Sequence, residues 1–209
     1  MCLVVKYIII VPCVVDKTTA KNVSYLQEGK QMEFFNVDLH GYEAQLPVLP
    51  LPSGVKICFF NLHGNVEMTE HCAKELAKMV SDCDVLLTAE SKGLQLTHVM
   101  AKLLGHKYYA VARKSKKLYM QDGIDVTINS SITTGTQQQL HISKFDADLM
   151  RGKKVGIIDD VVSTGNSLLG LEELVKLSGG TIQKKAFVLA EGDAAKRDDI
   201  CYLGVIPLL

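Results

Sequence analysis

The residues best suited to chemistry follow a short apolar run in the C-terminal half of the chain. Val155 to Ile158 has the pattern of a buried strand, and Asp159 and Asp160 come directly after it. In a parallel α/β sheet ligands bind beyond the carboxyl ends of the strands, so both acids are expected to face a crevice there. Two neighbouring carboxylates can accept hydrogen bonds from two hydroxyls. The pair therefore suits a diol.

The turn that follows the acids suits a phosphate group. It contains hydroxyls, a glycine and the expected start of a helix: Ser163, Thr164, Gly165, Asn166 and Ser167. Successive backbone N–H groups at a helix N-terminus can hold a phosphate dianion without a dedicated cationic side chain. Taken singly, the hydroxyl residues could be ordinary helix caps and the acids a solvated turn. Their combination favours a binding site.

This stretch resembles the signature of the type I phosphoribosyltransferases. The signature consists of four apolar residues, two acids, two apolar residues and a small Ser/Thr/Gly loop, and only Gly156 departs from it. The resemblance implies that Asp159 and Asp160 bind the ribose hydroxyls, with Mg²⁺ nearby and held indirectly. It also implies that residues 163–167 bind the 5′-phosphate and that Val161 packs against the purine ring.

Two further segments are similar to the adenine phosphoribosyltransferase branch. One is Glu90-Ser-Lys-Gly93, with Lys92 where arginine is usual, and the other is Arg113-Lys-Ser-Lys-Lys117. The pyrophosphate-binding residues that the resemblance implies are Ser91, Lys92, Gly93, Arg113, Lys114 and Lys117. Cations placed where negative charge accumulates on a leaving group stabilise its departure. A solvated basic surface is the alternative explanation for these side chains.

The chain departs from the adenine branch in one respect. Adenine enzymes usually carry a glutamate in a mobile loop, and the matching stretch here, Ser131-Ile-Thr-Thr-Gly135, has no carboxylate. Glu90, Asp122 or Asp125 could replace it, or the chain could use another base. The general acid or base therefore stays unassigned.

Alternating elements predict the fold. The expected strands and helices are a helix over 65–80, a β-α-β unit over 84–88, 94–104 and 107–112, and a second unit over 155–158, 167–177 and 182–189. Crossovers of this kind build a parallel sheet. We therefore predict an α/β phosphoribosyltransferase fold, with a core over 61–209 and a β-rich N-terminal hood over 1–60.

Two segments outside those units have their own character. The apolar run from Leu3 to Val15 is too short to span a bilayer and lacks a preceding basic residue, which favours a buried strand over a signal peptide. The polar stretch from Ser115 to Leu140 predicts a long mobile excursion, with an open hairpin that includes Ile124 to Ile128, acting as a lid.

Composition limits the partners and the compartment. Lys plus Arg and Asp plus Glu number 23 each in 209 residues, so no global positive field would attract nucleic acid or a membrane. The six cysteines form no C-x-x-C pair, which argues against a zinc site and a disulfide framework. We predict a cytoplasmic protein that binds neither nucleic acid nor membrane.

These patterns together predict an Mg²⁺-dependent enzyme that transfers the phosphoribosyl group of 5-phosphoribosyl pyrophosphate to an adenine-like purine in purine salvage. The resemblance also implies a homodimer. One alternative is a non-catalytic regulator that binds the sugar phosphate or a nucleotide, since regulators share this fold. A synthase that makes the sugar donor is a third, which the absence of an ATP-binding motif disfavours.

Overall fold

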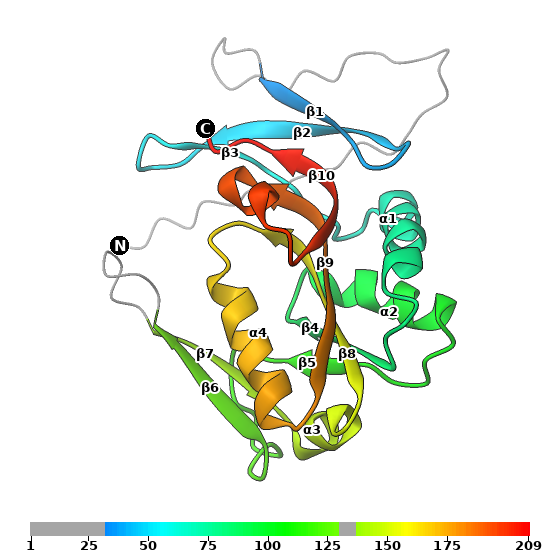
Figure 1. The fold of residues 1–209 in the computed structure, drawn as a ribbon. Coiled ribbons are helices and arrows are strands. Elements are labelled where there is room, and N and C mark those ends of the chain that lie inside the picture. Colours follow the sequence, from blue (N-terminus) through cyan, green and yellow to red (C-terminus); the bar gives the residue numbers. More distant parts are fainter. Residues whose placement is uncertain (1–31, 130–136) are drawn as a thin grey trace. The chain divides into compact units, whose positions relative to one another are not determined.

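A parallel sheet occupies the centre of the protein (Figure 1). The computed structural model describes residues 32–129 and 137–209, so the expected strand over Leu3–Val15 and the stretch Ser131–Gly135 lie outside the described residues. The five strands, in spatial order, are β10 (Cys201–Ile206), β9 (Thr181–Glu191), β8 (Lys154–Val162), β4 (Val85–Ala89) and β5 (Ala110–Ala112). All neighbouring pairs run parallel. The predicted α/β fold class is confirmed.

The sheet has a topological switch point between β4 and β8. From β8 the chain continues outward to β9 and β10, whereas from β4 it continues the other way to β5. Helices that cross over in opposite directions separate at such a point and leave a crevice at the carboxyl ends of the two strands. The predicted ribose- and phosphate-binding residues lie at the end of β8 or directly after it, whereas the predicted pyrophosphate-binding residues follow β4 and β5.

Helices cover both faces of the sheet (Figure 1). They are α1 (Val66–Met79), α2 (Gly93–Leu103), α3 (Lys144–Met150) and α4 (Asn166–Leu177). Neighbouring residues of a strand point to opposite faces, and β8 shows this because Ile158 joins the apolar cluster under α1 and α2, whereas Ile157 joins the cluster under α3 and α4. Burial on both sides explains why the strands are almost continuously apolar.

A small antiparallel sheet precedes the parallel one. It consists of β1 (Phe34–Asp38), β2 (Glu43–Pro50) and β3 (Lys56–Cys58), with β2 in the middle. Val37, Leu46 and Val48 alternate with exposed residues and belong to the same apolar cluster as α1 and α2. The β-rich character expected near the N-terminus is present in this segment, and the boundary at residue 60 stays a prediction.

The hairpin expected within 115–140 is present, but it packs against α4 instead of being open, and the mobility of the excursion stays a prediction. β6 (Ile124–Asn129) and β7 (Gln137–Ile142) pair with each other and pack against α4. Val126, Ile128 and Leu140 are buried, because the few apolar residues alternate and so face one side. A Cβ at Gly170 of α4 would lie 2.3 Å from Ile128 Cδ1, so the hairpin approaches the helix backbone directly.

Strand β8 extends four residues beyond its predicted end at Ile158. Its pairing with β9 continues to Val162 opposite Ala190, so Asp159 and Asp160 lie within the strand and not in the turn. Its pairing with β4 ends with Thr88 opposite Ile158. A prediction from one sequence missed this extension because acids are uncommon in strands. The predicted strand over 107–112 is shorter than expected, because pairing with β4 begins at Ala110.

Gly156, the residue that departs from the family signature, is required by its neighbours. A Cβ there would lie 3.0 Å from both Cys83 Sγ and Leu86 Cδ2. We expect Gly156→Val to lower the free energy of unfolding by about 1–3 kcal/mol, because the core would be overpacked. Urea denaturation measures this loss, and Cys83→Ala in the same chain should recover part of it by removing the sulfur. Strictly additive losses in the double variant would contradict this explanation.

Candidate active site

The ladder between β4 and β8 stops at the carboxyl ends of the two strands, which is where a fold of this kind is expected to bind its ligand. Helices α2 and α4 begin there, and neither has a side-chain hydrogen bond at its N-cap. In contrast, Asn65 caps α1 and Ser143 caps α3. No N-cap side chain therefore competes with a ligand for the first N–H groups of α2 and α4, of which Leu94 N–H donates to the Ser91 carbonyl oxygen at 3.3 Å, and the positive ends of both helix dipoles favour an anion.

Asp159 is half-buried in β8 and accepts a hydrogen bond from the backbone N–H of Asp160 at 3.0 Å. Burial, followed by the negative charge of Asp160, raises its pKa to about 7. The charge of Lys114 acts in the opposite direction. Asp159 is therefore a carboxyl group whose ionisation falls in the physiological range, which is characteristic of functional sites.

Asp160 is more buried than the sequence analysis expected, with only 7% of its surface exposed. Its Oδ2 has no hydrogen-bond partner in the described part of the chain. Lys92 Nζ lies 3.5 Å from that oxygen and also 3.4 Å from the carbonyl oxygen of Phe60. Lys92 therefore provides the compensating charge that a buried carboxylate requires.

Gly93 permits the close approach of the segment after β4 to the acids on β8. A Cβ at this position would lie 2.3 Å from Thr88 Oγ1 and 3.0 Å from Asp159 Oδ1. Any larger residue would push the start of α2 away from Asp159. Sequence reasoning missed Thr88, which is fully buried with an unpaired hydroxyl among the described residues and which the chain marks only as a polar residue in an apolar strand.

A cavity of about 140 Å³ joins one of the acids to the predicted phosphate loop. Asp159 and Val161 line it together with every residue of the loop over 163–167. Gly165 adopts φ +80°, a conformation that favours glycine, and it forms the N-cap of α4. The structure therefore brings three predicted parts of the site together in one cavity. These are Asp159, which is predicted to bind the ribose, Val161, which is predicted to contact the purine, and the predicted phosphate loop.

Two of the basic residues after β5 form ion pairs, and two others are exposed. Arg113 Nη1 lies 2.5 Å from Glu90 Oε1, which joins the segment after β5 to the segment after β4. Lys116 is instead bound to Asp125 at 2.6 Å. Lys114 and Lys117 are exposed, and so is Ser91.

The carboxylates considered as replacements for the missing glutamate are partly engaged elsewhere. Glu90 is paired with Arg113, and Asp125 is bound to both Lys116 and His141, whose Nδ1 lies 2.9 Å from Asp125 Oδ1. These two contacts, that of Lys116 first, lower the pKa of Asp125. Asp122 is exposed. A lowered pKa makes Asp125 a weak proton acceptor near neutral pH.

Within residues 32–129 and 137–209, no cluster of three or more His, Cys, Asp or Glu side chains could hold a metal ion by itself. None of the helices in this part of the chain is long and apolar enough to cross a membrane.

Comparison with known proteins identifies the class. The model of the phosphoribosyl transferase domain matches residues 61–207, and the chain belongs to this family of enzymes. Its resemblance to the adenine branch is confirmed by relatives such as adenine phosphoribosyltransferase of Thermotoga maritima, which is 31% identical over 157 residues, or 74% of this chain and 87% of the relative. Xanthine phosphoribosyltransferase of an Exiguobacterium species is 26% identical over 149 residues, or 70% and 75% of the two chains.

Solved structures agree on the fold. The crystal structure of adenine phosphoribosyltransferase from Thermoanaerobacter pseudethanolicus superposes with a TM-score of 0.62 at 21% identity, covering 77% of this chain and 94% of that one. The enzyme from Rhodothermus marinus gives the same TM-score at 19% identity, covering 78% and 94%.

The raised pKa of Asp159 predicts a pH-dependent stability. Its pKa is about 7 in the folded protein and near 3.8 when exposed, so between these values the folded state retains a proton that the unfolded chain has lost. The free energy of unfolding should therefore fall as pH rises from about 4 to above 7. Asp159→Asn has no titrating carboxyl at this position and so does not lose this stability. The free energy of unfolding of the variant minus that of wild type should therefore increase from pH 5 to pH 8, by an amount of the order of a few kcal/mol.

Urea denaturation at several pH values measures this difference. Asp148→Asn is the matched control, because a hydrogen bond from Lys144 lowers the pKa of the exposed Asp148. That variant should show no growing gain above pH 5. Parallel pH profiles for wild type and Asp159→Asn would contradict the assignment of a raised pKa to Asp159.

Proposed function

We propose that the protein transfers the phosphoribosyl group of 5-phosphoribosyl pyrophosphate to an adenine-like purine, in purine salvage. The observation that carries this proposal is the carboxyl end of β8, where two carboxylates lie near two helix N-termini that lack side-chain caps. Carboxylates suit the hydroxyls of a ribose, and free N–H groups suit the phosphates on either side of it.

Each part of the donor has a partner in this arrangement. The diol would bind Asp159 and Asp160, and the 5′-phosphate would bind the loop over 163–167. The pyrophosphate would lie at the start of α2, beside Ser91, Lys92 and Gly93. Lys92 can contact the pyrophosphate there because its side chain is 42% exposed and its Nζ lies no closer than 3.5 Å to Asp160 Oδ2.

Mg²⁺ fits the donor set of this crevice. Carboxylate oxygens are the protein ligands that Mg²⁺ prefers, and Oδ2 of Asp160 is buried without a hydrogen bond among the described residues. Two carboxylates do not complete the octahedral coordination that Mg²⁺ prefers, so hydroxyl and phosphate oxygens of the donor would supply other ligands. When bound, the ion would neutralise charge on the pyrophosphate.

The reaction that these groups support is displacement at the anomeric carbon. A nitrogen of the base forms a bond to C1′ while the bond from C1′ to the pyrophosphate oxygen breaks, and the nitrogen loses its proton. Lys92 and Arg113, with Lys114 and Lys117, would stabilise the negative charge on the leaving pyrophosphate. Val161 would pack against the purine ring, and the residue that accepts the proton stays unassigned.

The decisive experiment offers purified protein the donor, Mg²⁺ and one base at a time from adenine, guanine, hypoxanthine, xanthine and uracil. Nucleotide formation with adenine is the expected result, and chromatography of the products measures it. Xanthine is an informative member of the panel, because a xanthine phosphoribosyltransferase is among the relatives. Tight donor binding without turnover of any base would favour the regulator, and no binding would contradict both functions.

Removing both acidic charges tests the ribose assignment. Asp159→Asn with Asp160→Asn should weaken binding of the donor and Mg²⁺ at least tenfold, because amides bind the ion poorly. Isothermal titration calorimetry measures the affinity, and circular dichroism verifies the fold. A folded double variant with wild-type affinity would refute the assignment.

We also propose that the protein acts as a homodimer in which Arg113, Lys114 or Lys117 of one chain reaches the pyrophosphate bound by the other. The backbone of Arg113 is bridged to His141 of β7, whereas Lys114 and Lys117 are exposed, so a partner can approach the two lysines. Arg113 already contacts Glu90 of its own chain, which leaves the two exposed lysines as the stronger candidates for contacts across the interface.

Mixing inactive variants tests this arrangement. One chain carries Arg113→Ala and Lys117→Ala, and the other carries Asp159→Asn and Asp160→Asn. The mixture should recover part of the activity, because one of the two sites in the heterodimer combines the intact acids of the first chain with the intact cations of the second. Native mass spectrometry verifies that subunits have exchanged. A verified heterodimer without activity would indicate that the cations act within their own chain.

A further inference from the structure

Arg197 lies just after the carboxyl end of β9, where it follows the short 3₁₀ helix η1 (Gly192–Lys196). Its guanidinium forms a two-point contact with Asp199, through Nε to Oδ1 at 2.9 Å and through Nη2 to Oδ2 at 2.8 Å. A forked contact of this kind fixes the plane of the guanidinium. The remaining nitrogen, Nη1, has no hydrogen-bond acceptor among the residues that the structure describes.

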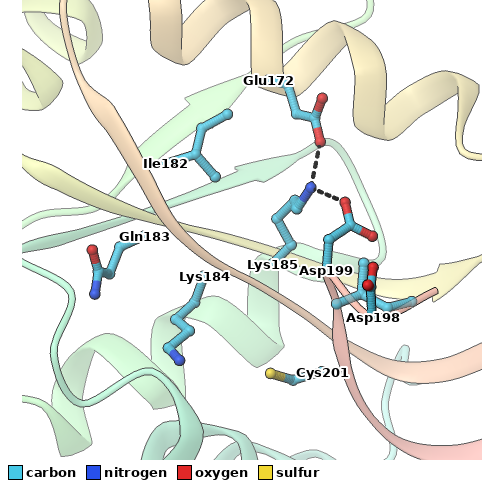
Figure 2. A pocket seen from close by; sticks show the side chains of 9 residues that line it. Glu172, Ile182, Gln183, Lys184, Lys185, Asp198, Asp199 and Cys201 are labelled. Carbon is cyan, nitrogen blue, oxygen red and sulfur yellow. Dashed lines mark hydrogen bonds and ion pairs between the residues drawn. The ribbon is translucent and has the colours of Figure 1, made fainter.

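Asp199 is itself held in place by a second cation. Figure 2 shows Lys185 of β9 between two carboxylates, with Nζ 2.8 Å from Glu172 Oε1 of α4 and in contact with Asp199. These side chains line a cavity of about 470 Å³ at the start of β9. The hydrogen bonds from Arg197 and Lys185 lower the pKa of Asp199 to about 2, so its carboxylate is ionised at neutral pH.

The free nitrogen of Arg197 is close to the start of α4. Nη1 lies 3.3 Å from the position that a Cβ at residue 165 would take. Gly165 is the N-cap of α4 and has no side chain to separate the guanidinium from the loop. The side chain of Arg197 is 34% exposed, so a ligand can reach it.

We propose that Arg197 is a further phosphate-binding residue of the donor site, with Nη1 donating to the 5′-phosphate, and that Asp199 is its positioning residue. The inference rests on the proposed function, which places that phosphate at the loop over 163–167. The sequence had indicated that backbone N–H groups and hydroxyls hold the dianion without a dedicated cation. Arg197 supplies that cation from a segment more than thirty positions further along the chain.

The test compares ribose 5-phosphate with inorganic pyrophosphate as ligands in calorimetry. Arg197→Ala should weaken ribose 5-phosphate about 10- to 100-fold, the range for a charge-assisted hydrogen bond, and leave pyrophosphate unchanged. Asp199→Asn should weaken it less, because the guanidinium remains but is no longer fixed. Lys196→Ala is the matched control, since Lys196 is adjacent, exposed and paired with Asp193 at 2.6 Å, and it should match wild type.

Other outcomes separate this inference from the proposed function. If Thr164→Ala weakens ribose 5-phosphate and folded Arg197→Ala does not, the inference fails alone. Equal losses for ribose 5-phosphate and pyrophosphate would also overturn it, because they indicate a general structural effect. If wild type binds no ribose 5-phosphate, both fail. Arg197→Gln, which keeps part of the side chain without its charge, replaces the alanine variant if that variant does not fold.

Discussion

The unequal pairing of β8 is the constraint on which the site depends. On one side β8 remains paired with β9 as far as Val162, which holds Asp159 and Asp160 in extended backbone. On the other side its pairing with β4 stops at Ile158, so the segment after β4 can turn away and begin α2. A strand supported on one edge only can present two consecutive acids rigidly at an opening. A turn at the same position would hold them less firmly.

Rigid presentation of these acids has an electrostatic cost. Burial, followed by the negative charge of the adjacent Asp160, raises the pKa of Asp159 to about 7. The ammonium group of Lys92 partly balances the negative charge of Asp160, but its Nζ lies 3.5 Å from Oδ2. That oxygen has no hydrogen bond among the described residues. Two acids of this kind are complementary to a ligand that brings hydroxyls and a divalent cation, since both would relieve the repulsion.

The sequence predicted the central elements because their signals are local. A strand that ends in acids and is followed by a glycine-containing turn identifies β8 and the start of α4, and alternation of strands and helices predicts the parallel sheet. It did not predict that β8 continues through the acids, because that depends on pairing with β9. It predicted a hairpin that includes Ile124 to Ile128, but not that β6 and β7 pack against α4, because their apolar residues are few, although all lie on one side. Contacts such as Arg197 beside Gly165 join distant segments, and no local pattern indicates them.

A crystal structure of the protein with ribose 5-phosphate and Mg²⁺ tests the central claim most directly. The phosphate is expected at the N-terminus of α4, within hydrogen-bond distance of backbone N–H groups of residues 163–167, with the ribose hydroxyls at Asp159 and Asp160. A sugar phosphate bound elsewhere, for example in the cavity beside Lys184 and Lys185, with the crevice between β4 and β8 free of ligand, would contradict it.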